Sequence, residues 1–137
     1  MPYRPTIARL TNNPLNFFRV YPLIEPASAW AAQSFSGKAI FITGASRGIG
    51  RLTAIVFAKA GAAVAIAARS EGALEDTKQA VLKEVPSAKV EKYVVDVKNT
   101  AQVEAAVDAA AAAFGRLDVV VANAGALTVF GQSEHQI

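Results

Sequence analysis

A turn with three glycines constrains the fold of this chain more than any other stretch. It has the sequence T-G-A-S-R-G-I-G at residues 43 to 50, between an apolar segment of strand character and an amphipathic helical pattern. Gly44 permits a sharp bend, Gly48 permits a ligand to approach the backbone, and Gly50 permits a helix to pack closely on a strand. Because the start of a helix carries unpaired amides, the turn is predicted to bind phosphate groups.

Short apolar strands and helical patterns alternate along the chain from residue 37 onward. This alternation is typical of βαβ units with a parallel sheet between two layers of helices. Right-handed crossovers bring the fourth strand back beside the first. We therefore predict an α/β fold, a Rossmann-type doubly wound parallel sheet of four strands in the order 3-2-1-4. The predicted strands are residues 39–43, 63–67, 89–95 and 117–122.

Three helices are predicted between these strands: residues 48–60, residues 70–85, and a third that starts after Asn99 and ends before Gly115. Ser70 is the predicted N-cap of the second helix, and Asn99 with Gln102 is predicted to form a capping pair for the third. Apolar residues at helical spacing predict the buried face of the first helix. These residues are Ile49, Leu52, Val56 and Ala60.

The composition excludes several classes of protein. The chain of 137 residues is long enough for about one domain. It has no cysteine and a single histidine, His135, which argues against disulfides, thiolate catalysis and a metal site. No apolar run reaches the roughly 18 residues of a membrane-spanning helix, and a net charge of +3 does not require a nucleic-acid partner.

Residues 1–35 are predicted to form a proline-rich extension ahead of a domain at residues 36–137. Five of the six prolines fall within the first 26 residues, where they disfavour regular structure. The extension has arginines and no acid before Glu25, so a mitochondrial presequence is the alternative. Because dense prolines would break the amphipathic helix of such a signal, we expect a cytoplasmic protein.

The end of the second strand predicts which nucleotide is bound. An acid at this place bonds the ribose hydroxyls of NAD, whereas an arginine suits the 2′-phosphate of NADP. Here the sequence is A-A-R, ending in Arg69, and the glycine turn itself contains Arg47 and the hydroxyl of Ser46. NADP is therefore predicted rather than NAD. The alternative is that Arg69 is an ordinary solvated arginine that Glu71 partly neutralises.

The third strand is followed by an acidic residue, Asp96. At this edge of the sheet its carboxylate is placed to accept a hydrogen bond from the adenine amino group, with Val97 lining the ring pocket. The alternative is that Asp96 acts as a cap-like carboxylate near the start of the helix after Asn99.

Together these motifs resemble the classical short-chain dehydrogenases/reductases (SDRs). The resemblance covers about residues 37 to 127 and rests on the glycine turn, on A-A-R after the second strand, on D-V at residues 96–97 and on N-A-G at residues 123–125. It implies that N-A-G stabilises the central sheet and lines the adenosine ribose. The candidate cofactor-binding residues are Gly44, Ser46, Arg47, Gly48, Ile49, Gly50, Arg69, Asp96, Val97, Asn123, Ala124 and Gly125.

The same resemblance implies hydride transfer between a nicotinamide cofactor and a carbonyl or alcohol substrate. In the family a serine, a tyrosine and a lysine four residues after that tyrosine perform the chemistry. None of the three tyrosines, Tyr3, Tyr21 and Tyr93, has such a lysine. We therefore assign no catalytic residue and expect a truncated, N-terminal cofactor-binding portion, which would need the missing half to act on a substrate.

Two alternatives to an oxidoreductase portion stay open at this point. The first is a non-catalytic nucleotide-binding or interaction module that self-associates through the fourth strand, whose V-V-V at residues 119–121 would form an exposed apolar edge. The second is a non-functional fragment.

Overall fold

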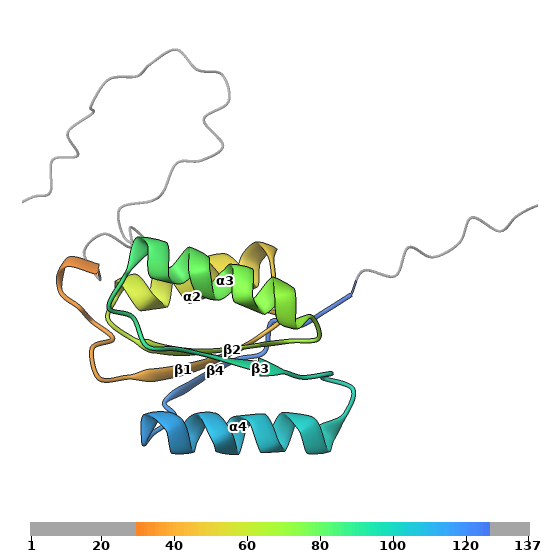
Figure 1. The fold of residues 1–137 in the computed structure, drawn as a ribbon. Helices are drawn as coiled ribbons and strands as arrows, with labels where there is room; N and C mark the ends of the chain where they lie inside the picture. The colour runs from red at the N-terminus through yellow and green to blue at the C-terminus, as the bar shows by residue number, and fades with distance from the viewer. Residues whose placement is uncertain (1–29, 127–137) are drawn as a thin grey trace, which may run out of the picture.

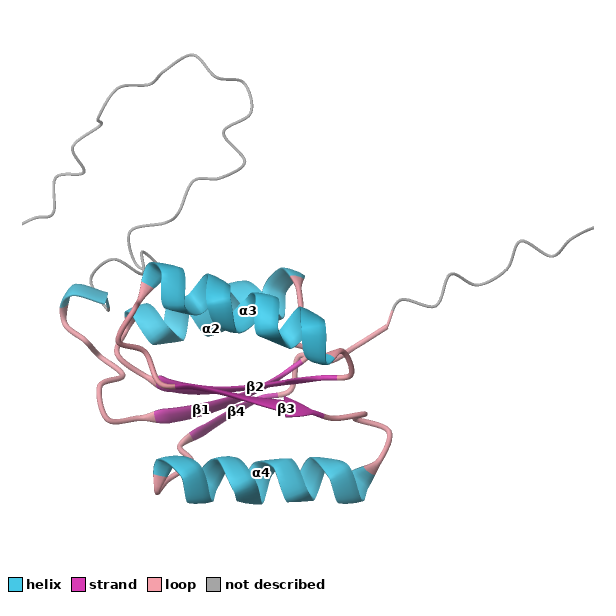
Figure 2. Ribbon diagram, in the orientation of Figure 1, coloured by secondary structure: helices cyan, strands magenta, loops and turns pink. Residues whose placement is uncertain are grey.

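A computed structural model of the chain describes residues 30–126. One parallel sheet lies between α2 and α3 on one face and α4 on the other (Figure 1, Figure 2). The strand order is β3-β2-β1-β4, which confirms the predicted topology. The strands are β1 (Ala39–Thr43), β2 (Ala63–Ala68), β3 (Val90–Val94) and β4 (Val119–Val121). The helices are α2 (Gly48–Lys59), α3 (Glu71–Glu84) and α4 (Thr100–Phe114).

The core consists of two apolar layers, one on each face of the sheet. Successive side chains of a strand point to opposite faces. In β1, Ile40 and Ile42 therefore pack with α2 and α3, whereas Phe41 packs with α4. All five residues of β1 are buried, as expected for a strand with a neighbour on each side and helices on both faces.

The buried face of α2 is not the one predicted from its apolar spacing. Three of the four expected residues are exposed: Ile49 (76%), Leu52 (62%) and Val56 (40%). The buried residues of α2 are instead small and four positions apart: Gly50, Ala54 and Ala58. The prediction was wrong because a close contact of Gly50 with the glycine turn, described below, sets the rotation of the helix.

The predicted helix caps are present, with one difference. The Ser70 hydroxyl accepts a hydrogen bond from the Ala73 N–H, and the Asn99 side chain accepts one from the Gln102 N–H. The side chain of Gln102, however, accepts from the Asp96 N–H at 2.9 Å and not from the cap residue. Gln102 therefore fastens the end of β3 to α4 rather than completing a reciprocal capping pair.

Residues 30–35, which were assigned to the extension, pack against the end of α2. The Phe35 N–H donates to the Ala60 carbonyl at 2.9 Å, and the Phe35 ring meets the Phe57 ring edge-on with centroids 5.0 Å apart. Residues 1–29 lie outside the described residues, so the structure does not test the rest of the predicted extension. Within residues 30–126, no helix has both the length and the apolar character needed to span a bilayer.

Asp118 anchors the start of β1 to the segment before β4 and gives the fold a pH dependence. Its carboxylate accepts from the Arg116 guanidinium at 2.6 and 2.8 Å and from the Ala39 N–H at 2.9 Å. The Arg116 hydrogen bond, followed by that from Ala39, lowers the pKa of Asp118 from 3.8 to about 2. Because the folded-state pKa is the lower one, this stabilisation is complete above about pH 4 and is lost as the pH falls through about 2.

We predict that Asp118→Asn lowers the thermal midpoint at pH 7, and that the difference from wild type shrinks as the pH falls from about 4 to 2. Thermal unfolding followed by circular dichroism at several pH values measures this. Asp108→Asn, which changes an exposed carboxylate on α4, is the matched control. A difference between wild type and Asp118→Asn that is independent of pH would contradict the assignment.

Candidate functional site

The predicted site residues gather around a cavity of about 300 Å³ at the carboxyl ends of the strands. This is the edge of a parallel sheet where ligands bind in doubly wound folds. Ten of the twelve predicted residues line the cavity: Gly44, Ser46, Arg47, Gly48, Ile49, Arg69, Val97, Asn123, Ala124 and Gly125. Gly50 and Asp96 do not line it, whereas Ala68 and Val95 do and were not predicted.

The glycine turn is held in shape by close contacts at two of its glycines. Gly44 has φ +67°, and a Cβ placed on it would lie 2.8 Å from the Ala124 Cα. A Cβ on Gly50 would lie only 2.2 Å from the Gly44 carbonyl oxygen and 2.7 Å from the Asn123 Nδ2. Gly48 has φ +57° and no neighbour within 4 Å of such a Cβ. Gly50 therefore acts by close packing behind the cavity, while Gly48 keeps a left-handed backbone at the cavity wall.

Thr43 and Asn123 tie the turn to the loop after β4. The Thr43 hydroxyl donates to the Val121 carbonyl and accepts from the N–H groups of Asn123 and Ala124 at 3.1 and 3.0 Å. The Asn123 amide in turn donates to the carbonyls of Thr43 and Gly44 at 3.2 and 3.3 Å. Thr43 opens the glycine motif but was not among the predicted site residues, and in the structure its side chain contacts the loop after β4 and does not line the cavity.

Backbone amides at the start of α2 are available to an anion. Arg47 occupies the N-cap position in an extended conformation, and no side chain caps the helix there. Among residues 30–126, the N–H groups of residues 46 to 49 donate to no hydrogen bond in the structure. Unpaired amides together with the positive end of the helix dipole form an anion-binding site.

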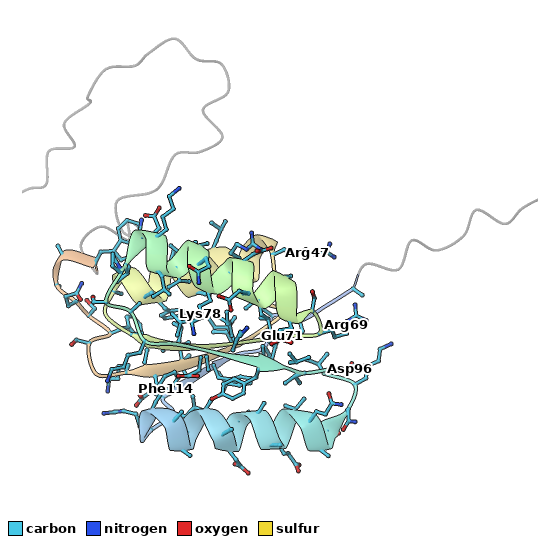
Figure 3. All side chains as sticks on the ribbon, in the orientation of Figure 1. Arg47, Arg69, Glu71, Lys78, Asp96 and Phe114 are labelled. Carbon is cyan, nitrogen blue, oxygen red and sulfur yellow. The ribbon has the colours of Figure 1, made fainter. Side chains whose placement is uncertain are left out.

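Arg47 and Arg69 line the same cavity, at the end of the sheet opposite Phe114 (Figure 3). The ion pairs found among residues 30–126 include neither arginine. The carboxylate considered as a neutralising partner, Glu71, lies 3.5 Å from the Lys92 ammonium instead. Both residues are exposed.

Asp96 has a local structural role. Its carboxylate accepts from the Lys98 N–H at 3.0 Å, and its carbonyl accepts from the Asn99 N–H at 2.9 Å. These bonds shape the turn that leads into α4, which favours the cap-like alternative for Asp96. The neighbouring Val97 is 47% exposed and lines the cavity.

Tyr93 is the one tyrosine among residues 30–126, and it lies away from the cavity. Its ring packs on Phe41 with centroids 6.2 Å apart, on the α4 face of the sheet. Burial raises the pKa of Tyr93, with a smaller contribution from the charge of Glu91. A phenol in this place has a structural role and is not positioned to exchange a proton with a ligand at the strand ends.

A second cavity, of about 350 Å³, lies at the opposite end of the sheet. Lys38, Lys89 and Arg116 line it, close to the residues at which the three helices end. Helix C-termini carry partial negative charge, so cations at this end offset the helix dipoles. The charge of this cavity is therefore explained by the fold, and the cavity at the carboxyl ends of the strands is the candidate site.

Comparisons with known proteins point to one family. The family model described as short chain dehydrogenase matches residues 38–136. Among curated proteins, short chain dehydrogenase pigC of Monascus ruber is 44% identical over 115 residues, which covers 81% of this chain and 37% of that protein. The chain thus spans little more than a third of the length of this relative.

Solved structures share the fold at similar identity. NAD+-bound xylitol dehydrogenase is 34% identical with a TM-score of 0.64, over 67% of this chain and 35% of that chain. The C-domain with NADP of bacterial malonyl-CoA reductase is 34% identical with a TM-score of 0.65, over 72% of this chain and 16% of that chain. One of these structures holds NAD+ and the other NADP, so the shared fold is found with either cofactor.

Proposed function

The chain belongs to the short chain dehydrogenase family, and from this premise we propose that it binds NADP(H) in the cavity at the carboxyl ends of its strands. The observation that carries the proposal is a pair of arginines, Arg47 and Arg69, beside the unpaired amides of the glycine turn. The amides suit a phosphate group, and the two guanidinium groups add the positive charge that a further phosphate requires.

The preference for NADP over NAD rests on charge. NADP differs from NAD by a 2′-phosphate on the adenosine ribose, and an arginine can bond such a group through two parallel N–H donors. Within residues 30–126 the Glu71 carboxylate forms an ion pair with the Lys92 ammonium and none with Arg69. The same ammonium lies 2.8 Å from the Glu75 carboxylate. The charge of Glu71, which would otherwise repel the 2′-phosphate, is therefore partly neutralised by Lys92.

The proposed role in catalysis is to hold the nucleotide for hydride transfer with a carbonyl or alcohol substrate. When bound, the nicotinamide would donate or accept the hydride. The residues that line the cavity would hold the adenosine and phosphate portions of the nucleotide. The amides of the turn would bind the phosphates, and Arg69 would lie on the ribose side. Val97 and Ala68 would form the apolar wall. We assign the proton transfer of such a reaction to no residue of this chain.

A second candidate function is association through β4. Among the described residues β4 pairs only with β1, so its other edge is open, and Val120 is 56% exposed. An open, uncharged strand edge can pair with another strand. In this case the chain would use the nucleotide as a structural ligand, and light scattering at increasing protein concentration would show a rise in mass.

Titration calorimetry of the full chain with NADP and with NAD tests the proposed function. We expect NADP to bind at one site per chain and at least about tenfold more tightly than NAD, because one charge-assisted hydrogen bond contributes about 1.5–3 kcal/mol. Failure to bind either nucleotide would overturn the proposal, and tighter binding of NAD would overturn the cofactor preference alone.

A further inference from the structure

A polar network, buried at Thr77 and partly buried at Arg51, connects α3 to the glycine turn through side chains outside the cavity lining. Thr77, on α3, is fully buried, with an exposed fraction of 0%. Its hydroxyl donates to the Ala45 carbonyl at 2.8 Å and accepts from the Arg51 Nε at 2.9 Å. The Arg51 Nη2 donates to the Ser46 carbonyl at 2.6 Å. Two successive carbonyls of the turn are thus fastened by side chains that do not line the cavity.

The direction of these carbonyls fixes the direction of the amides that follow them. In a trans peptide unit the C=O and the N–H of the next residue point in opposite directions within one plane, and no cis peptide bond occurs among the described residues. Holding the Ala45 carbonyl toward Thr77 therefore turns the Ser46 N–H away from it. Holding the Ser46 carbonyl toward Arg51 does the same for the Arg47 N–H. Ser46 and Arg47 line the cavity, whereas Ala45 does not.

We propose that Thr77 and Arg51 are positioning residues for nucleotide binding, which orient the Ser46 and Arg47 amides toward a phosphate group of the ligand. The inference rests on the proposed function and extends it to residues outside the cavity. A turn rich in glycine has many backbone conformations, so a fixed orientation of its peptide planes must come from its surroundings. Without the network, part of the binding free energy would be spent in ordering the turn.

The chemistry of the two side chains fits this role. A threonine hydroxyl has one donor and can accept as well, so Thr77 satisfies both the Ala45 carbonyl and Arg51. The planar guanidinium of Arg51 reaches two acceptors at once, which a lysine ammonium on a flexible stem does not reproduce. Arg51 forms none of the ion pairs found within residues 30–126, so its charge also adds to the positive potential behind the turn.

The test compares NADP binding by the full chain carrying Thr77→Val, Thr77→Ser or Arg51→Lys. Valine keeps the shape and loses the hydroxyl, so we expect the Kd for NADP to rise about tenfold. Serine restores the hydroxyl and should bind within about twofold of wild type. Lysine keeps the charge of Arg51 but lacks a planar guanidinium that reaches two acceptors. We therefore expect Arg51→Lys to raise the Kd for NADP about as much as Thr77→Val does.

A matched control separates positioning from general stability. Val81 lies one turn further along the same buried face of α3, is also 0% exposed, and does not contact the turn through a hydrogen bond. Val81→Ala should lower the thermal midpoint and leave the Kd unchanged, when binding is measured well below the midpoint. A Val81→Ala variant that loses as much affinity as Thr77→Val would overturn the inference.

A spectroscopic measurement reports on the amides directly. In ¹H–¹⁵N spectra we expect NADP to move the Ser46 and Arg47 amide resonances downfield in wild type and less in Thr77→Val. If wild type binds NADP and Thr77→Val matches it in Kd and in these shifts, the inference fails and the proposed function stands. If wild type binds neither NADP nor NAD, the proposed function fails, and this inference fails with it.

Discussion

Replacement of Gly50 by alanine is expected to lower the free energy of unfolding by about 3 kcal/mol and to weaken NADP binding more than about tenfold. The added Cβ would lie 2.2 Å from the Gly44 carbonyl oxygen and 2.8 Å from the carbon that carries it. Both atoms belong to the backbone, so no side-chain rotation relieves the overlap. Either α2 must move away from the sheet, or the glycine turn must leave the conformation that lines the cavity.

The neighbouring glycine provides a matched control, because the same substitution there has a different physical effect. A Cβ on Gly48 meets no atom within 4 Å, but its φ of +57° disfavours a side chain by about 1–2 kcal/mol. Urea unfolding and titration calorimetry of both variants measure the two effects. Similar losses for Gly48→Ala and Gly50→Ala would contradict the argument that close packing, and not backbone conformation, makes Gly50 necessary.

The topology of the sheet could be predicted from sequence because it depends on local patterns that follow one after another. β1, β2 and β4 are short apolar runs, α3 and α4 begin at the caps Ser70 and Asn99, and right-handed crossovers restrict how such elements can be connected. The orientation of α2 about its axis could not be predicted in this way. It depends on the contact between Gly50 and the Gly44 carbonyl, and the apolar spacing of Ile49, Leu52 and Val56 points to the wrong face.

Most of the cavity wall could also be predicted, since the carboxyl ends of parallel strands meet at one edge of a sheet. The network behind it could not. Thr77 and Arg51 are 26 positions apart in the sequence, and neither stands in a recognisable motif. Spacing along the chain does not show that a threonine in the middle of a helix points at a carbonyl of a turn, so such a positioning role becomes visible only in three dimensions. Asp96 differs in the other direction: the motif predicted it as a site residue, but its carboxylate accepts a hydrogen bond within its own turn and it does not line the cavity.

Arg69→Ala is expected to raise the Kd for NADP about 10- to 100-fold and to leave the Kd for NAD within about twofold of wild type. The reason is that the guanidinium would bond the 2′-phosphate, which only NADP carries. Among residues 30–126 Arg69 has no ion-pair partner, so its removal leaves no carboxylate without a counter-charge within the fold. The thermal midpoint of the free protein should therefore stay close to that of wild type.

The ratio of the two dissociation constants, measured by calorimetry on one protein preparation, isolates the effect of Arg69 from any general loss of folded protein. Lys83→Ala removes one exposed positive charge from the last turn of α3 and is the matched control for net charge. It should leave the ratio unchanged, since its charge lies at the other end of the helix and is screened by salt. Equal weakening of NADP and NAD by Arg69→Ala would show that Arg69 does not select between them, and the preference would then have to come from Arg47 alone.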